Sequence, residues 1–137
     1  MRLPEVLRRR AVVWPLAIAA LIFVASSRSQ VAGVDISMSD KVVHFCVYGL
    51  LATLVCRVGR GWRGAVLGLV VASVYGASDE WHQSTVPGRA AELADWVADT
   101  LGAATAVVLY TGWGAYRKLL ETPLRWRRAR PAAGNAV

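Results

Sequence analysis

The sequence predicts an all-α fold, an integral membrane bundle of four transmembrane helices with both termini in the cytoplasm. The chain has 137 residues, 55% of them hydrophobic, and a mean hydropathy of +0.40. A soluble domain of this size rarely carries so much apolar sequence. The apolar residues are concentrated in four stretches, at residues 11–27, 42–56, 64–78 and 93–116.

The lengths of these stretches decide between a membrane and a soluble bundle. A transmembrane helix needs about 20 apolar residues, with about 17 as a lower limit. The stretches at 42–56 and 64–78 are shorter, and Lys41, Arg57 and Arg63 can extend them by reaching toward the headgroups. The alternative of a water-soluble bundle is disfavoured because the connecting loops are too small to surround four apolar helices with polar sequence.

The first stretch also resembles a secretory signal peptide. A basic segment, Arg8–Arg10, precedes it, and small residues follow at 25–27. The apolar run is long for a signal peptide, however, and no clear cleavage site follows. We therefore expect residues 11–27 to be retained as the first span, with cleavage as the alternative.

Basic residues are distributed very unequally between the two sides of the predicted membrane. Thirteen of the 16 Lys and Arg residues lie at the two termini or between the second and third stretches, and Arg28, Lys41 and Arg89 are the exceptions. By the positive-inside rule, both termini are cytoplasmic. The prediction is a basic cytoplasmic N-terminus at 1–10, a membrane domain at 11–116 and a basic cytoplasmic tail at 117–137. This tail either contacts anionic headgroups or is simply solvated.

The net charge of +7 would also suit a protein that binds nucleic acid. The arginines flank apolar stretches and form no separate basic domain, so we expect membrane lipid and no nucleic acid as a partner.

Small residues recur every four positions along the third and fourth stretches. They are Gly64, Gly68, Ala72 and Gly76 in the third, and Ala98, Gly102 and Ala106 in the fourth. Such stripes allow helices to approach closely. We expect these two helices to pack against each other; homodimerisation is the alternative, and the oligomeric state stays open.

Polar residues share helical faces at the predicted extracytoplasmic ends. The three sets are Asp40, His44 and Tyr48, then Asp79, His82 and Gln83, and then Asp95, Asp99 and Gly102. Ionisable groups at a membrane are costly and usually functional. Asp40 can accept a hydrogen bond from His44 one turn away and fix its tautomer. We expect the three faces to converge in one cluster.

A short connection at residues 84–92 follows the second polar set. Its Pro87–Gly88 pair is typical of a tight turn and places Arg89 on an ordered loop. A guanidinium there can bind a phosphate or carboxylate with two hydrogen bonds. The alternative is an internal ion pair between Arg89 and an acid of the cluster.

At these positions the sequence resembles the VanZ-like family of small integral membrane proteins. The resemblance covers residues 36–110 and rests on Asp40-Lys41-x-x-His44-x-x-x-Tyr48, Asp79-Glu80-x-His82-Gln83-x-x-x-Pro87-Gly88-Arg89 and Asp95-x-x-x-Asp99-x-x-Gly102. It implies a four-helix domain and a role in the cell envelope. The family is named for a protein linked to teicoplanin resistance, so a relation to glycopeptide resistance is an expectation from the resemblance alone.

Three functions remain open for the cluster. In the first, the protein binds a lipid-linked or lipidated anionic envelope molecule, and His44, His82 and Arg89 contact its polar head. In the second, it is an enzyme acting on a phosphate- or sugar-bearing lipid at the outer leaflet by acid–base catalysis. In the third, the polar groups only lock three helices together.

Each candidate residue has a predicted role in these schemes. The catalytic candidates are His44, His82, Asp79 and Asp40, and the metal-ligand candidates for a metal-dependent variant are His44, His82, Asp79 and Asp99. The further predicted ligand-binding residues are Lys41, Tyr48, Glu80, Gln83, Arg89, Asp95 and Asp99. The sequence identifies no particular cofactor and leaves open whether a reaction is catalysed.

Overall fold

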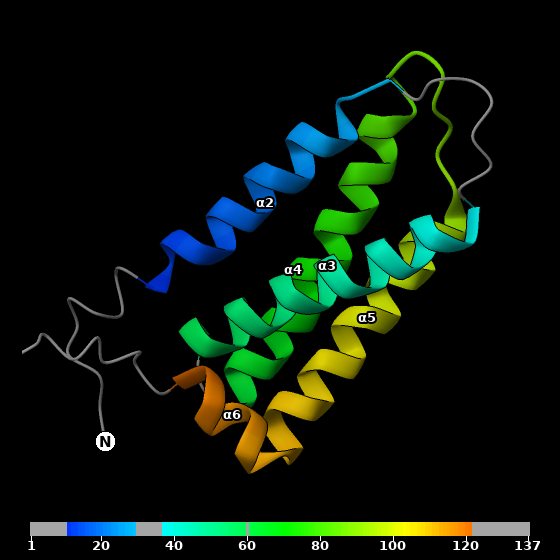
Figure 1. Ribbon diagram of the computed structural model, residues 1–137. Coiled ribbons are helices and arrows are strands. Elements are labelled where there is room, and N and C mark those ends of the chain that lie inside the picture. The colour runs from blue at the N-terminus through cyan, green and yellow to red at the C-terminus, as the bar shows by residue number, and fades with distance from the viewer. Residues whose placement is uncertain (1–10, 30–36, 60, 122–137) are drawn as a thin grey trace, which may run out of the picture.

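The computed structural model describes residues 11–29, 37–59 and 61–121, and within these it contains helices and no strands (Figure 1). The helices are α2 (Val13–Ser26), α3 (Ser37–Gly59), α4 (Gly61–Gln83), α5 (Leu93–Gly112) and α6 (Gly114–Glu121). The predicted all-α class is confirmed. The basic N-terminus at 1–10 and the tail from 122 onward lie outside the described residues.

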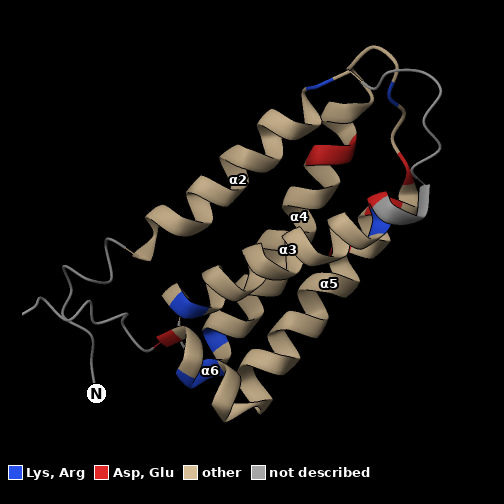
Figure 2. Cartoon of the chain, viewed as in Figure 1, with Lys and Arg blue, Asp and Glu red and all other residues tan. Residues whose placement is uncertain are grey.

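Helices α2 to α5 run alternately in opposite directions (Figure 1). The end of α2, the start of α3, the end of α4 and the start of α5 therefore share one end of the bundle, which we call the acidic end. Figure 2 shows that charged residues gather at the two ends and leave the helices between them largely uncharged. The acidic end carries most of the predicted site residues.

Two helices have the length and composition of membrane spans. Asp40–Gly59 in α3 and Leu93–Gly112 in α5 are each 20 residues long and apolar enough to cross a membrane, and less than half of either segment is buried. Large apolar side chains such as Leu50 and Leu101 face outward. Helix α2 is apolar but has only 14 residues, which is about 21 Å of helix. By length and composition, α3 and α5 are thus the two candidate membrane spans among the described residues.

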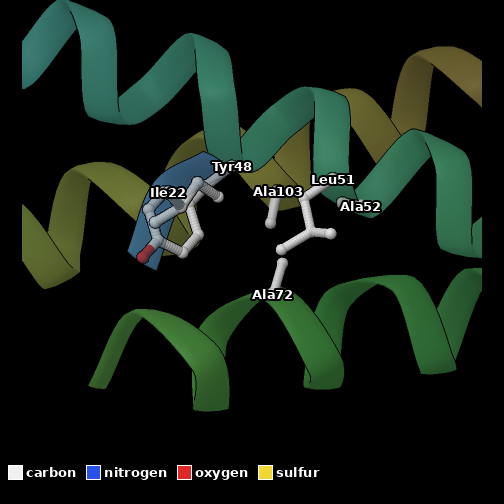
Figure 3. Close-up of a cluster of buried hydrophobic side chains, with 6 residues drawn as sticks. All are labelled: Ile22, Tyr48, Leu51, Ala52, Ala72 and Ala103. Carbon is white, nitrogen blue, oxygen red and sulfur yellow. The ribbon is translucent and has the colours of Figure 1, made fainter. Parts of the chain in front are cut away.

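Helix α3 is the centre of the bundle, because α4 and α5 both pack along most of its length. Its core residues Leu51 and Ala52 face Ala72 of α4 and Ala103 of α5 (Figure 3). Helix α2 contributes Ile22 to this core but packs less extensively than the other three. Three of its six residues are alanines, so the helices lie close together around Ile22, Tyr48 and Leu51.

The small-residue stripes pack differently from the prediction. A side chain on Gly68 of α4 would collide with Ala52 and Cys56 of α3, and a side chain on Gly102 of α5 would overlap the backbone of Phe45 in α3. These glycines thus lie against α3. Helices α4 and α5 also pack against each other, as predicted, but most of the stripe glycines do not form that contact. Only Gly76 meets the predicted partner, since it lies against Asp99 of α5.

The predicted fourth stretch, 93–116, is interrupted. Helix α5 ends at Gly112, Trp113 adopts an extended conformation with φ −104° and ψ 95°, and α6 begins at Gly114. The Tyr110 hydroxyl donates a 2.7 Å hydrogen bond to Glu121 Oε1. Glycines on both sides of Trp113 favour the break, because glycine is a poor helix former. The predicted span therefore ends four residues earlier than expected.

Candidate functional site

A cavity of about 450 Å³ opens at the acidic end between α2, α3, the end of α4 and the following loop. Its apolar lining residues are Leu21, Ile22, Ala25, Val43 and Val47. Its polar lining residues are Ser26, Asp40, His44, Tyr48, Asp79, Gln83 and Arg89. The cavity thus joins an apolar wall to a polar end, which is an arrangement suited to an amphipathic molecule.

His44 is held from behind by α5. Its Nδ1 lies 2.9 Å from Asp99 Oδ1, and the two side chains are 9% and 0% exposed. The rings of His44 and Tyr48 are nearly parallel, with centroids 6.0 Å apart. Asp99 therefore fills the role predicted for Asp40, since a carboxylate on one ring nitrogen fixes the tautomer and leaves the other nitrogen for a ligand or a proton.

Lys41 joins the start of α3 to the start of α5. Its Nζ lies 2.8 Å from Asp95 Oδ1 and 3.0 Å from Glu92 Oε2. Asp95 is almost completely buried, so the ammonium group compensates a carboxylate that would otherwise be costly to bury. None of these three residues lines the cavity. In the structure these ion pairs connect α3 to α5. The role in ligand binding predicted for Lys41 and Asp95 stays a prediction.

Asp79 forms the junction between α2 and α4. Its Oδ2 accepts hydrogen bonds from Ser26 Oγ at 2.8 Å and from Gln83 Nε2 at 2.9 Å. Ser26 was not predicted as a site residue from sequence, where it belongs to the small residues at 25–27 that resemble a cleavage motif. One signal in the sequence could have identified Ser26. Its hydroxyl lies in the last turn of an otherwise apolar helix, at the same predicted membrane depth as Asp79.

His82 lies on the α2 side of α4 and does not line the cavity. Its ring stacks on Phe23 with centroids 4.7 Å apart, and its Nε2 is 3.0 Å from Ser27 Oγ. The structure does not bring His82 to His44, so the proposed ligand set of His44, His82, Asp79 and Asp99 is not assembled in the described residues. His82 instead docks the end of α2.

Glu80 turns inward from the other side of α4. Its side chain is buried, and its Oε2 accepts a 2.7 Å hydrogen bond from the backbone N–H of Glu92. This contact fixes the end of the loop that precedes α5. Glu80 also belongs to a buried group with His44 and Asp99, in which one potential ligand atom of each lies within 4.8 Å of the others.

Arg89 follows a tight turn, as the Pro87–Gly88 pair predicted. The Arg89 N–H donates a 3.1 Å hydrogen bond to the Val86 carbonyl, and Gly88 has φ +80°. A positive φ at this position is typical of a type II turn and favours glycine. The Arg89 side chain lines the cavity, and it forms no ion pair with residues 11–29, 37–59 or 61–121. A guanidinium is thus available at the cavity.

Fold and site together define a small all-helical protein with membrane-spanning character and a buried cluster of acids and histidine at one end. The chain belongs to the VanZ/LLP1 family, whose model matches residues 7–115. No curated protein and no solved structure matches the chain. The family resemblance inferred from the three polar patterns is confirmed, and it supports a VanZ-like protein of the cell envelope.

Proposed function

We propose that this protein is a multi-pass protein of the cell membrane that binds a lipid-linked or lipidated anionic envelope molecule on the extracytoplasmic side. The observation that carries the proposal is the cavity with an apolar wall and Arg89 at its polar end. An acyl or polyprenyl chain fits beside Leu21, Ile22 and Val47, while a phosphate or carboxylate fits the guanidinium fork.

The cavity is lined by two acids, Asp40 and Asp79, and these need not repel the anionic head of a ligand. Asp79 already accepts two hydrogen bonds, and His44 offers a ring nitrogen that Asp99 does not occupy. Arg89 and His44 can therefore contact the head, while Asp40 is positioned to accept a hydrogen bond from a hydroxyl or amide of the same molecule. A relation to glycopeptide resistance rests on the family name alone and stays a prediction.

The proposal requires four spans and an acidic end outside the cell. A protein lacking Cys46 and Cys56 should be given a single cysteine in place of Ala90 or of Gly114, which lie at opposite ends. We expect an impermeant thiol reagent to label the Ala90→Cys variant on intact cells. The Gly114→Cys variant should react only after permeabilisation, because basic flanks are retained inside. The reverse labelling pattern would overturn the orientation.

Arg89 provides the test of ligand binding. In native mass spectrometry of protein extracted from its own membranes, we expect an adduct with the mass of an anionic lipid-linked or lipidated molecule. The Arg89→Gln substitution should lower its occupancy at least about tenfold, because a hydrogen bond to a charged group contributes about 1.5–3 kcal/mol. Arg89→Lys should give an intermediate loss, since an ammonium lacks the planar fork.

Arg117→Gln is the matched control, because Arg117 lies near the opposite end of the bundle. It removes the same charge and should leave the adduct unchanged. An adduct that survives Arg89→Gln and Arg117→Gln equally, or the absence of any adduct, would contradict binding at the cavity.

Catalysis on the same molecule is the second candidate, and the His44–Asp99 pair favours it. A histidine held by a buried carboxylate is a common general base, and Asp79 or Asp40 would be the acid that completes the pair. In the same mass measurement, this function gives a cleaved or transferred product in the wild-type protein and the intact molecule when His44 is replaced. Binding alone gives the intact molecule in the wild-type protein.

A further inference from the structure

Three buried side chains from three helices meet below the polar end of the cavity. They are His44 of α3, Glu80 of α4 and Asp99 of α5, with whole-residue exposures of 8%, 6% and 0%. One potential metal-ligand atom of each lies within 4.8 Å of the other two. The group includes only one of the two acids predicted as metal ligands from sequence, and it includes Glu80, which was not predicted as one.

Two oxygens of this group lack partners. Asp99 Oδ2 and Glu80 Oε1 are buried and accept no hydrogen bond from any described residue. Their companion oxygens are bonded, Asp99 Oδ1 to His44 and Glu80 Oε2 to the Glu92 backbone. Burying a carboxylate oxygen without a donor or a cation is costly, so each oxygen requires an explanation.

The orientation of Asp99 shows where its free oxygen points. A Cβ added to Gly76 would lie 2.6 Å from Asp99 Oδ2, so this oxygen is directed at the surface of α4. Gly76 precedes Glu80 by four residues, which is one helical turn on the same face. The glycine leaves room for the Asp99 carboxylate to lie beside Glu80.

We propose that His44, Glu80 and Asp99 bind a divalent first-row metal cation such as Mn²⁺ or Zn²⁺. One imidazole and two carboxylates form a donor set that these ions accept, whereas Ca²⁺ prefers oxygen ligands alone. Ligand atoms about 2.1 Å from an ion are at most about 4.2 Å apart, so the group needs only a small contraction. His44 binds as a neutral imidazole.

An ion bound there would neutralise the two buried carboxylates, Glu80 and Asp99, beside the cavity. Because His44 also lines the cavity, the bound ion would lie next to the position proposed for the anionic head of the ligand. Metal binding by the three residues does not depend on any lipid, and so it stands apart from the ligand proposed above.

The test is a titration of detergent-solubilised, chelator-stripped protein with Mn²⁺, followed through the electron paramagnetic resonance signal of the free ion. We expect saturable binding at one site per chain, displaced by Zn²⁺. Asp99→Asn and Glu80→Gln should each weaken binding at least about tenfold, because each removes an anionic ligand with little change in shape. Circular dichroism checks that both variants remain helical.

Asp79→Asn is the matched control. Asp79 is equally buried and adjacent to Glu80 in sequence, but it lies outside the three-residue group, so this variant should keep Mn²⁺ binding. Arg89→Gln should also bind Mn²⁺ normally, which separates this result from a failure of lipid binding. Two outcomes would overturn the metal site: no saturable binding, or an Asp79→Asn loss equal to that of Glu80→Gln.

Discussion

Replacing Gly102 with alanine is expected to lower the free energy of unfolding by about 3 kcal/mol or more. The added methyl group would overlap the carbonyl of Phe45 in α3, and a backbone cannot move aside as a flexible side chain can. Overpacking of this kind costs about 1–3 kcal/mol and sometimes more. Chemical unfolding in a fixed detergent, followed by far-ultraviolet circular dichroism, measures the change.

Gly112→Ala is the control on the same helix. Apart from its chain neighbours and the backbone of its own helix, no described residue lies within 4 Å of the methyl group that it adds, so the free energy of unfolding should change by less than about 0.5 kcal/mol. Equal stabilities of the Gly102→Ala and Gly112→Ala proteins would show that α3 and α5 do not approach as closely as the structure has them. The comparison tests the central packing of the fold.

His44→Ala should cost about 3–5 kcal/mol of unfolding free energy, because it leaves the Asp99 carboxylate buried without its partner. The double variant His44→Ala/Asp99→Leu should recover a large part of this loss, since the unpaired charge is then gone. A double-mutant cycle that adds Asp99→Leu alone gives the coupling energy, which we expect at about 1–3 kcal/mol.

The stability-restored double variant also separates function from structure. If His44 contacts the ligand, this variant is folded but lacks the adduct that the wild-type protein retains. Full adduct occupancy in the double variant would favour the structural-network alternative. A coupling energy near zero would instead contradict the His44–Asp99 contact itself.

Part of the candidate site could be predicted from the sequence. Helical spacing placed Asp40, His44 and Tyr48 on one face, and all three line the cavity. The same reasoning grouped His82 with them, because spacing within one helix gives the face but not the neighbour that the face meets. In the folded chain His82 meets Phe23 and Ser27 of α2 instead.

The pairing of His44 shows the same limit. Asp40 lies one turn away on the same helix and was the nearest acid in sequence, whereas the partner in the structure is Asp99, 55 residues later. The rotation of α5 about its axis decides this, and the close approach of Gly102 to Phe45 is part of the same α3–α5 contact. No local pattern around His44 contains that information.

The sequence by itself determined the helical class, the end of each helix at which the polar residues gather, and the turn at Pro87–Gly88, because hydropathy, helical period and turn chemistry are properties of neighbouring residues. Only the tertiary structure decided that α3 is the central helix, that Gly64, Gly68 and Gly102 face it, and that Glu80 turns inward beside Asp99. Helix packing depends on how two surfaces fit together, and small residues permit close approach without specifying the helix that approaches.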